Sequence, residues 1–302
     1  MTPRERAVGA GRWLVSGPPL VYLVLFFAVP ALIMVLASFR TPGEFGGLTP
    51  LVDASGRLDV NVESYVRLVT EPVYAQVFVK SVGYAALTTL ICLALAYPLA
   101  ALVAQSPKRH RNLLLLLVIL PFWSNFLIRI YAWMIILGPQ AALARTVNAV
   151  LAWFGADPVA LLFSSFAVLV CLVYVHLPFM VLPLYANLEK HDPALLDAAR
   201  DLGANAWQRF WRITFPLSLP GVYAGAALVF IPALGIFAIP DILGGPDDSL
   251  IGNVIKQQFL ETRDWPFGSV LSIMLTIAAL VLAGLAAWVG RAGISGQRPG
   301  RA

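Results

Sequence analysis

The chain has 302 residues, of which 59% are hydrophobic and 12% are charged, and its formal net charge is +5. Its mean hydropathy is +0.80. Soluble domains carry roughly 25% charged residues. This composition therefore excludes an ordinary soluble protein, because so much apolar surface requires a lipid environment.

Six apolar segments follow one another along the chain, each long enough to cross about 30 Å of hydrocarbon as a helix. They lie at Leu20–Phe39, Ser81–Ala104, Leu113–Leu137, Leu161–Ala186, Leu217–Pro240 and Phe267–Val289. None shows the alternation of a barrel strand. We therefore predict an all-α integral membrane protein with six transmembrane helices in one domain, residues 20–290. The first segment has no convincing cleavage site, which indicates a retained anchor.

The distribution of Lys and Arg residues predicts how the chain is oriented in the membrane. An even number of spans places both termini on one side, together with the loops at 105–112 and 187–216, and these segments hold 13 of the 21 Lys and Arg residues. By the positive-inside rule, the N-terminus (1–19) and the tail (291–302) are cytoplasmic. The same side holds only 5 of the 16 acids. The acidic outer face would attract a cation, although the charge bias alone also explains it.

The loop between spans four and five carries clear helix signals. Asp192 is a capping residue, Pro193 suits the first helical position and Gly203 suits a C-terminal stop, so we predict a helix at Pro193–Leu202. The small Ala198-Ala199 pair would let another protein surface approach its backbone. The later aromatic stretch around Trp207 and Trp211 favours an interfacial amphipathic helix over a specific binding role.

This loop resembles the EAA signature of ABC importer permeases. Six residues carry the resemblance: Asp197, Ala198, Ala199, Gly203, Ile213 and Pro216. It implies a coupling helix that sits in a groove of a partner ATPase, with these residues in the coupling role. Asp197 stands where the family usually has Glu, which keeps the charge but shortens the reach.

Further blocks resemble the spermidine/putrescine (polyamine) permeases of this class. They are Pro121–Asn125, Arg129–Tyr131, Leu177–Met180, Leu243–Gly245, Ile251–Ile255 and Arg263–Gly268. The resemblance implies one of two non-identical permeases in the bacterial inner membrane, an ATPase dimer that holds ATP and Mg, and an external polyamine-binding protein. Two alternatives stay open: a permease of the same class for iron or an anion, and an ion-coupled secondary transporter.

The sequence indicates no chemistry of its own. It contains no phosphate-binding loop and no Gly-Lys dipeptide, so we expect no ATP hydrolysis by this chain. His110, His176 and His191 form neither a metal pattern nor a nucleophile–base pair. We predict no catalytic residue, no metal, no cofactor in this chain and no nucleic-acid partner.

Three residues are candidates for a polyamine pathway, because aromatic faces and sparse carboxylates can replace the hydration of a polycation. They are Trp123, Asp241 and Tyr131. Each residue also has an interpretation without a pathway role. Trp123 could pack in the protein or face lipid, Tyr131 could belong to the aromatic belt at the membrane surface, and Asp241 could be an external loop residue. Arg129 would repel a cation from the pore, so we expect it to pair with an acid or to reach the outer interface.

Overall fold

The computed structural model describes residues 16–43, 45–50, 52 and 59–295. These residues form helices and no strand, apart from an isolated bridge between Pro42 and Leu48. Six helical segments in this part are long and apolar enough to cross a membrane: Ser16–Ser38, Pro72–Gln105, Phe126–Trp153, Ser165–Leu188, Ala206–Leu234 and Trp265–Leu285. The predicted all-α fold with six spans is confirmed. Most of the predicted cytoplasmic ends, residues 1–15 and 296–302, lie outside the described part.

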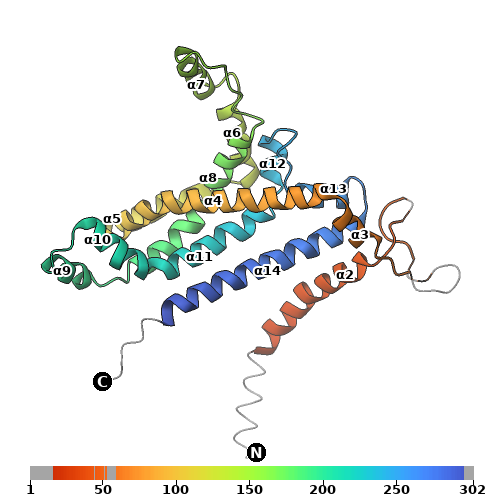
Figure 1. Ribbon diagram of the computed structural model, residues 1–302, viewed down its shortest axis with the longest axis horizontal. Coiled ribbons are helices and arrows are strands. Elements are labelled where there is room, and N and C mark those ends of the chain that lie inside the picture. The colour runs from red at the N-terminus through yellow and green to blue at the C-terminus, as the bar shows by residue number, and fades with distance from the viewer. Residues whose placement is uncertain (1–15, 44, 51, 53–58, 296–302) are drawn as a thin grey trace, which may run out of the picture. The chain divides into compact units, whose positions relative to one another are not determined.

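The chain divides into two compact units. Figure 1 labels their helices. The first contains the described residues up to Pro72 together with Ile255–Thr276. Its helices are η1 (Val24–Ala28), α2 (Val29–Ser38) and α3 (Glu63–Thr70), joined by the end of α13 (Ile251–Leu260) and the start of α14 (Trp265–Ser295). The π-turn η1 ends two residues before Pro30, which lacks a backbone donor.

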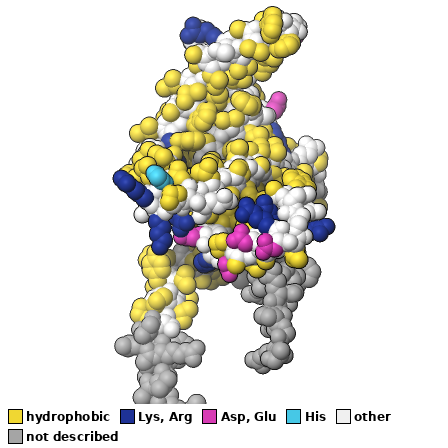
Figure 2. Space-filling view, turned by 90° about the vertical axis from the view of Figure 1, so that its left-hand side faces the viewer, with side chains coloured by type: hydrophobic (Ala, Val, Ile, Leu, Met, Phe, Trp, Pro, Cys, Tyr) yellow, Lys and Arg dark blue, Asp and Glu magenta, His cyan; other side chains and the backbone are white. Residues whose placement is uncertain are grey.

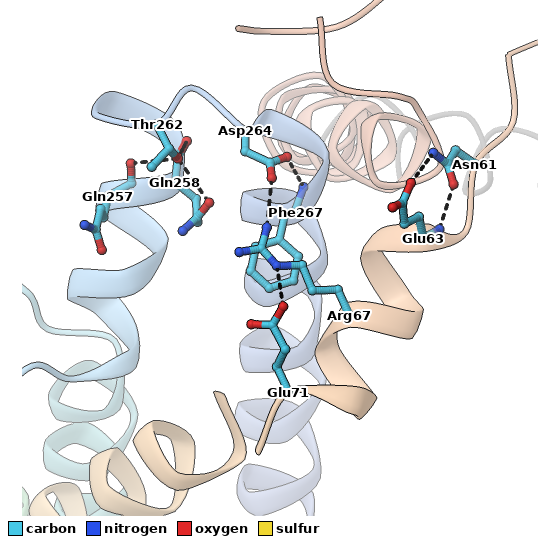
Figure 3. A network of polar contacts seen from close by, with 9 residues as sticks. All are labelled: Asn61, Glu63, Arg67, Glu71, Gln257, Gln258, Thr262, Asp264 and Phe267. Carbon is cyan, nitrogen blue, oxygen red and sulfur yellow. Dashed lines mark hydrogen bonds and ion pairs between the residues drawn. The ribbon is translucent and has the colours of Figure 1, made fainter. Parts of the chain in front are cut away.

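Arg67 connects α3 to the start of α14 (Figure 3). Its guanidinium pairs with Glu71 and Asp264, each at 3.2 Å, and lies 4.3 Å from the centre of the Phe267 ring. Asp264 also accepts a hydrogen bond from the backbone N–H of Phe267 at 3.2 Å. One planar cation thereby holds two helices that lie far apart in the sequence.

Asp59 organises the segment between α2 and α3. Its carboxylate accepts hydrogen bonds from the Thr41 hydroxyl at 2.6 Å, from the Thr49 hydroxyl and from the Thr41 backbone at 3.1 Å, with Arg40 at 3.4 Å. These donors, the Thr41 hydroxyl foremost, hold the pKa of Asp59 well below its usual range. The carboxylate is thus stabilised in its ionised form.

We expect Asp59→Asn to lower the melting temperature at neutral pH. A carboxyl group with a depressed folded pKa stabilises the fold above its unfolded pKa of about 3.9, and this contribution fades as the pH falls toward the folded value. The difference between wild type and variant should therefore be constant from about pH 6 to 8 and shrink below about pH 4. Melting curves in detergent test this, with the exposed Asp157→Asn as control. A pH-independent difference would contradict it.

The second unit contains Val73–Val254 and the chain from Ile277. After α4 (Pro72–Gln105) come α5 (Lys108–Ile119), η2 (Leu120–Trp123), α6 (Phe126–Leu137), α7 (Ala142–Trp153), α8 (Ser165–Leu188), α9 (Pro193–Asp201), α10 (Ala206–Arg209), η3 (Phe210–Thr214), α11 (Phe215–Leu234) and α12 (Ala238–Leu243). Helix α8 is the central element: its buried side chains belong to two core clusters, one shared with α6 and α12 and the other with α4 and α11.

Helices α8 and α11 approach each other closely because α11 carries glycines at the contact. A Cβ atom on Gly221 would lie 2.7 Å from Asn187 Cβ, and one on Gly225 would lie 2.6 Å from Met180 Sδ and 3.2 Å from the Met180 carbonyl. Small residues four apart on one helix face permit this backbone approach in a membrane.

Three spans differ markedly from the prediction. The second begins at Pro72 and not at the predicted Ser81. The third predicted span, Leu113–Leu137, is interrupted, because Pro121 lies in the short η2 turn and Asn125 caps a new helix by accepting a hydrogen bond from Leu127 N at 2.8 Å. The fifth, Leu217–Pro240, begins earlier: α10, η3 and α11 run continuously from Ala206 and end at Leu234. Asp241 consequently lies in the separate helix α12.

Candidate functional site

Helix α9 has the predicted caps. Asp192 Oδ1 accepts a hydrogen bond from Ala194 N at 3.0 Å, and Pro193 is the first helical residue. At the other end Gly203 has a φ of +78°, its N–H donates to the Arg200 carbonyl at 2.8 Å, and Ala204 N donates to the Ala199 carbonyl at 2.9 Å. This pair of bonds is a Schellman motif, which requires a residue in the left-handed conformation. The predicted helix is confirmed, one residue shorter at its end.

The surface of α9 is largely uncovered within this chain. Asp197 and Ala198 are exposed and Ala199 is buried, while Leu202 is 88% exposed. Asp197 lies 3.4 Å from Arg200, and both side chains are mostly exposed, so this ion pair adds little stability. Figure 2 views this end of the chain and shows acidic and basic side chains among apolar ones. Leu195 is also exposed, so α9 presents apolar and charged side chains together.

The remaining residues of the signature lie on the following helix. Ile213 is in η3 and Pro216 is in the first turn of α11, and both are partly buried. Asn205 and Gln208 form a capping box at the start of α10. Phe210 and Phe215 pack against Tyr97 of α4, whereas Trp207 is 70% exposed. The aromatic stretch thus runs without a break into the fifth candidate span, and its interfacial position stays a prediction.

The three predicted pathway residues lie on three different elements. Trp123, 75% exposed, ends η2, and Tyr131, 48% exposed, is in α6. Asp241 is exposed in the first turn of α12, and its Oδ1 accepts a hydrogen bond from Asn253 Nδ2. The elements of Tyr131 and Asp241, α6 and α12, pack against each other. The pathway role of the three residues stays a prediction.

The guanidinium of Arg129 lies over the rings of Phe122 and Phe126, at 5.2 and 5.9 Å from their centres. These are cation–π contacts. Among the described residues Arg129 has no acidic partner, and the other predicted alternative, the outer interface, stays a prediction.

Asn253 is a functional candidate that the sequence did not single out. It is buried, and its amide donates to the Phe237 carbonyl at 2.9 Å as well as to Asp241, while its Oδ1 accepts from Leu250 N at 3.0 Å. The neighbouring Gly252 lies against the carbonyls of Gly235 and Ile236, which a Cβ would meet at 2.6 and 2.7 Å. Asn253 and Gly252 together fix the break between α11 and α12, and with it the position of Asp241.

A second such residue is Asp248, which is 5% exposed. Its carboxylate accepts hydrogen bonds from Ser165 at 2.5 Å, Tyr84 at 3.0 Å and Gly245 N at 2.9 Å, and Lys80 lies at 3.8 Å. Burial alone would raise the pKa of Asp248, but these donors outweigh burial and hold the pKa below its usual value. The carboxylate connects α4 and α8 to the loop after α12. Three of its four partners are distant in sequence.

Six apolar helices and a capped helix in a polar loop describe a multi-pass membrane protein, and its class follows from the family match. Residues 96–292 match the family described as "Binding-protein-dependent transport system inner membrane component", and the chain belongs to this inner-membrane family. The chain is also 45% identical over 258 residues to "Spermidine/putrescine transport system permease protein PotB" of Salmonella typhimurium (strain SL1344), covering 85% of each protein. PotB of Haemophilus influenzae is 43% identical, over 86% of this chain and 87% of the relative. The predicted resemblance to polyamine permeases is confirmed.

A solved structure shares the fold. It is titled "Crystal structure of a bacterial ABC transporter involved in the import of the acidic polysaccharide alginate", with a TM-score of 0.73, 19% identity and coverage of 95% of this chain and 98% of that one. A fold shared with a protein of such different solute does not specify the solute here.

Proposed function

We propose that this chain is the permease subunit of an ATP-driven importer that moves spermidine and putrescine into the cytoplasm. The observation that carries the proposal is 43–45% identity, over about 85% of the chain, to permeases named for these two solutes. In this proposal the transmembrane helices form the path across the membrane, and α9 is the contact for the ATPase subunit. No catalytic group in this chain is required.

In this proposal α9 docks into a groove of the ATPase subunit. Asp197 and Ala198 form the exposed contact on α9, Ala199 packs on the buried face of α9, Gly203 turns the chain, and Ile213 and Pro216 fix the base of the following helix. ATP and Mg bind to the ATPase dimer, and its closure moves α9 and the attached spans. The loop carrying α9 then faces the cytoplasm, as do both termini.

The complete importer has further parts. A second, homologous permease forms the other half of the path, and an external binding protein delivers the solute, as the family's description as binding-protein-dependent suggests. Substrate crosses by alternating access between the two permeases. The membrane domain of this chain is residues 20–290, with the coupling loop at 187–216.

Asp241 is the proposed carboxylate of the path, so Asp241→Asn should reduce spermidine uptake at subsaturating solute by about tenfold, corresponding to roughly 1.4 kcal/mol. The neighbouring exposed Asp247 offers a matched control, and Asp247→Asn should stay within about twofold of wild type. Uptake into proteoliposomes containing the complete transporter measures both. Equal effects of the two substitutions would contradict a specific role for Asp241.

The same proteoliposomes separate the proposal from an ion-coupled transporter. Uptake should require internal ATP and the external binding protein, and should persist when ion gradients are collapsed. Uptake that survives the removal of ATP would refute the ATP-driven mechanism.

A further inference from the structure

Arg111 joins three separate parts of the second unit. It lies in the first turn of α5, where its Nη2 donates to the carbonyls of Ala104 at 2.9 Å and Ser106 at 3.3 Å. Its Nη1 donates to Glu189 Oε1. Ala104 belongs to the last turn of α4 and Glu189 follows directly after α8. A planar guanidinium can hold such divergent acceptors at once, which a lysine ammonium does less well.

The contact lies at the base of α9. Glu189 is the C-terminal cap of α8, and α9 starts at Pro193. The backbone between them is tightly turned: Glu189 N donates to the Tyr185 carbonyl at 2.9 Å, and Lys190 N donates to the Asn187 carbonyl at 3.1 Å. This turn leaves little slack, so a displacement of α9 also displaces the Glu189 carboxylate.

Arg111 is also more protected than an ordinary surface cation. Its side chain is 18% exposed, against 41% for Glu189. Arg109, on the same helix, is exposed. Loss of the Glu189 partner therefore leaves a mostly buried guanidinium with one acceptor fewer, which costs more than breaking an exposed pair.

We propose that Arg111 is a positioning residue that transmits movement of α9 to α4 and α5 through Glu189. The inference rests on the proposed function, because it assumes that α9 is the element moved by the ATPase. Movement then reaches the spans by three routes: covalently into α8, covalently through α10 and η3 into α11, and through the guanidinium into the ends of α4 and α5. Without Arg111 only the two covalent routes remain.

The test measures solute transported per ATP hydrolysed by the assembled, reconstituted transporter. Arg111→Gln and Glu189→Gln should each lower this ratio by about fivefold, and the double variant should be no worse than the more affected single variant, because both break one interaction. Arg111→Lys should give an intermediate ratio, and Arg109→Gln a wild-type ratio. A purely structural role would lower the amount of assembled transporter and leave the ratio unchanged.

Wild-type ratios in the Arg111 and Glu189 variants would overturn the proposal, as would losses that multiply in the double variant. If the transporter with Arg111→Gln does not assemble, Glu189→Gln breaks the same ion pair at its more exposed residue. The transport ratio of that variant then tests the proposal. Failure of the proposed function is distinct: the wild-type transporter itself would then show no ATP-dependent polyamine uptake.

Discussion

Gly203→Val should reduce ATP-dependent uptake by at least about tenfold, because it strains the end of α9 and adds bulk to the proposed docking surface. The left-handed conformation at φ +78° costs a β-branched residue roughly 1–2 kcal/mol. No atom outside the neighbouring residues lies within 4 Å of the position that a Cβ would occupy. The added side chain therefore meets no internal obstacle and projects into open space, where the proposed ATPase would dock. We expect the variant to insert and keep its spans, but to lose both uptake and solute-stimulated ATP hydrolysis.

Gly155 provides a matched control for backbone strain. It has a φ of +72° and likewise has no atom within 4 Å of the position that a Cβ would take, but it lies after α7, away from the coupling loop. Gly155→Val should keep uptake within about twofold of wild type. Gly203→Asn should also retain most activity, since Asn tolerates the left-handed region. Wild-type uptake by Gly203→Val would argue against the coupling role of this loop.

Gly225→Val should destabilise the protein more than any other substitution considered. The new Cβ would lie 2.6 Å from Met180 Sδ, which must find another position, and 3.2 and 3.3 Å from the Met180 carbonyl oxygen and Cα, which are backbone atoms. Relief of the backbone contacts requires α11 to shift slightly away from α8. Overpacking of a tight core costs about 1–3 kcal/mol, and separating the two central helices adds to this cost. We expect a fall of about 5 °C or more in the melting temperature in detergent, with poor yield of the assembled transporter.

Gly83 in α4 serves as the comparison, because it is also a mid-helix glycine but has open space around its Cβ position. Gly83→Val should change the melting temperature by about 2 °C or less. Equal losses in the two variants would attribute the effect to helix propensity and would contradict close packing between α8 and α11.

Local signals in the sequence predicted α9 well. The caps Asp192 and Gly203 act within a few residues of the backbone groups that they satisfy, so their spacing was sufficient to place the helix. The third span was less predictable, because hydropathy alone does not show that Pro121 and Asn125 interrupt an apolar stretch.

Residues with distant partners could not be found in this way. One of the hydrogen bonds to Asp248 comes from Tyr84, which is 164 residues away in the sequence. The sequence around either residue carries no signal for this pairing. Gly221 and Gly225 form a small-xxx-small pattern, which in the sequence alone predicts a close helix–helix contact. That the contacting helix is α8 is known only from the structure. Asn253 belongs to the block Ile251–Ile255 that resembles the polyamine permeases. Its hydrogen bond to Asp241 shows what this residue of the block does in the structure.

Solute-stimulated ATP hydrolysis by the complete transporter with its external binding protein tests the proposed importer most directly. Spermidine, putrescine, ferric iron and an oxyanion are compared in the wild type and in Gly203→Val. We predict stimulation by the two polyamines alone, and loss of that stimulation in the variant. Stimulation by iron or the oxyanion without any response to polyamines would contradict the assigned solute, and full polyamine stimulation in Gly203→Val would contradict the coupling role.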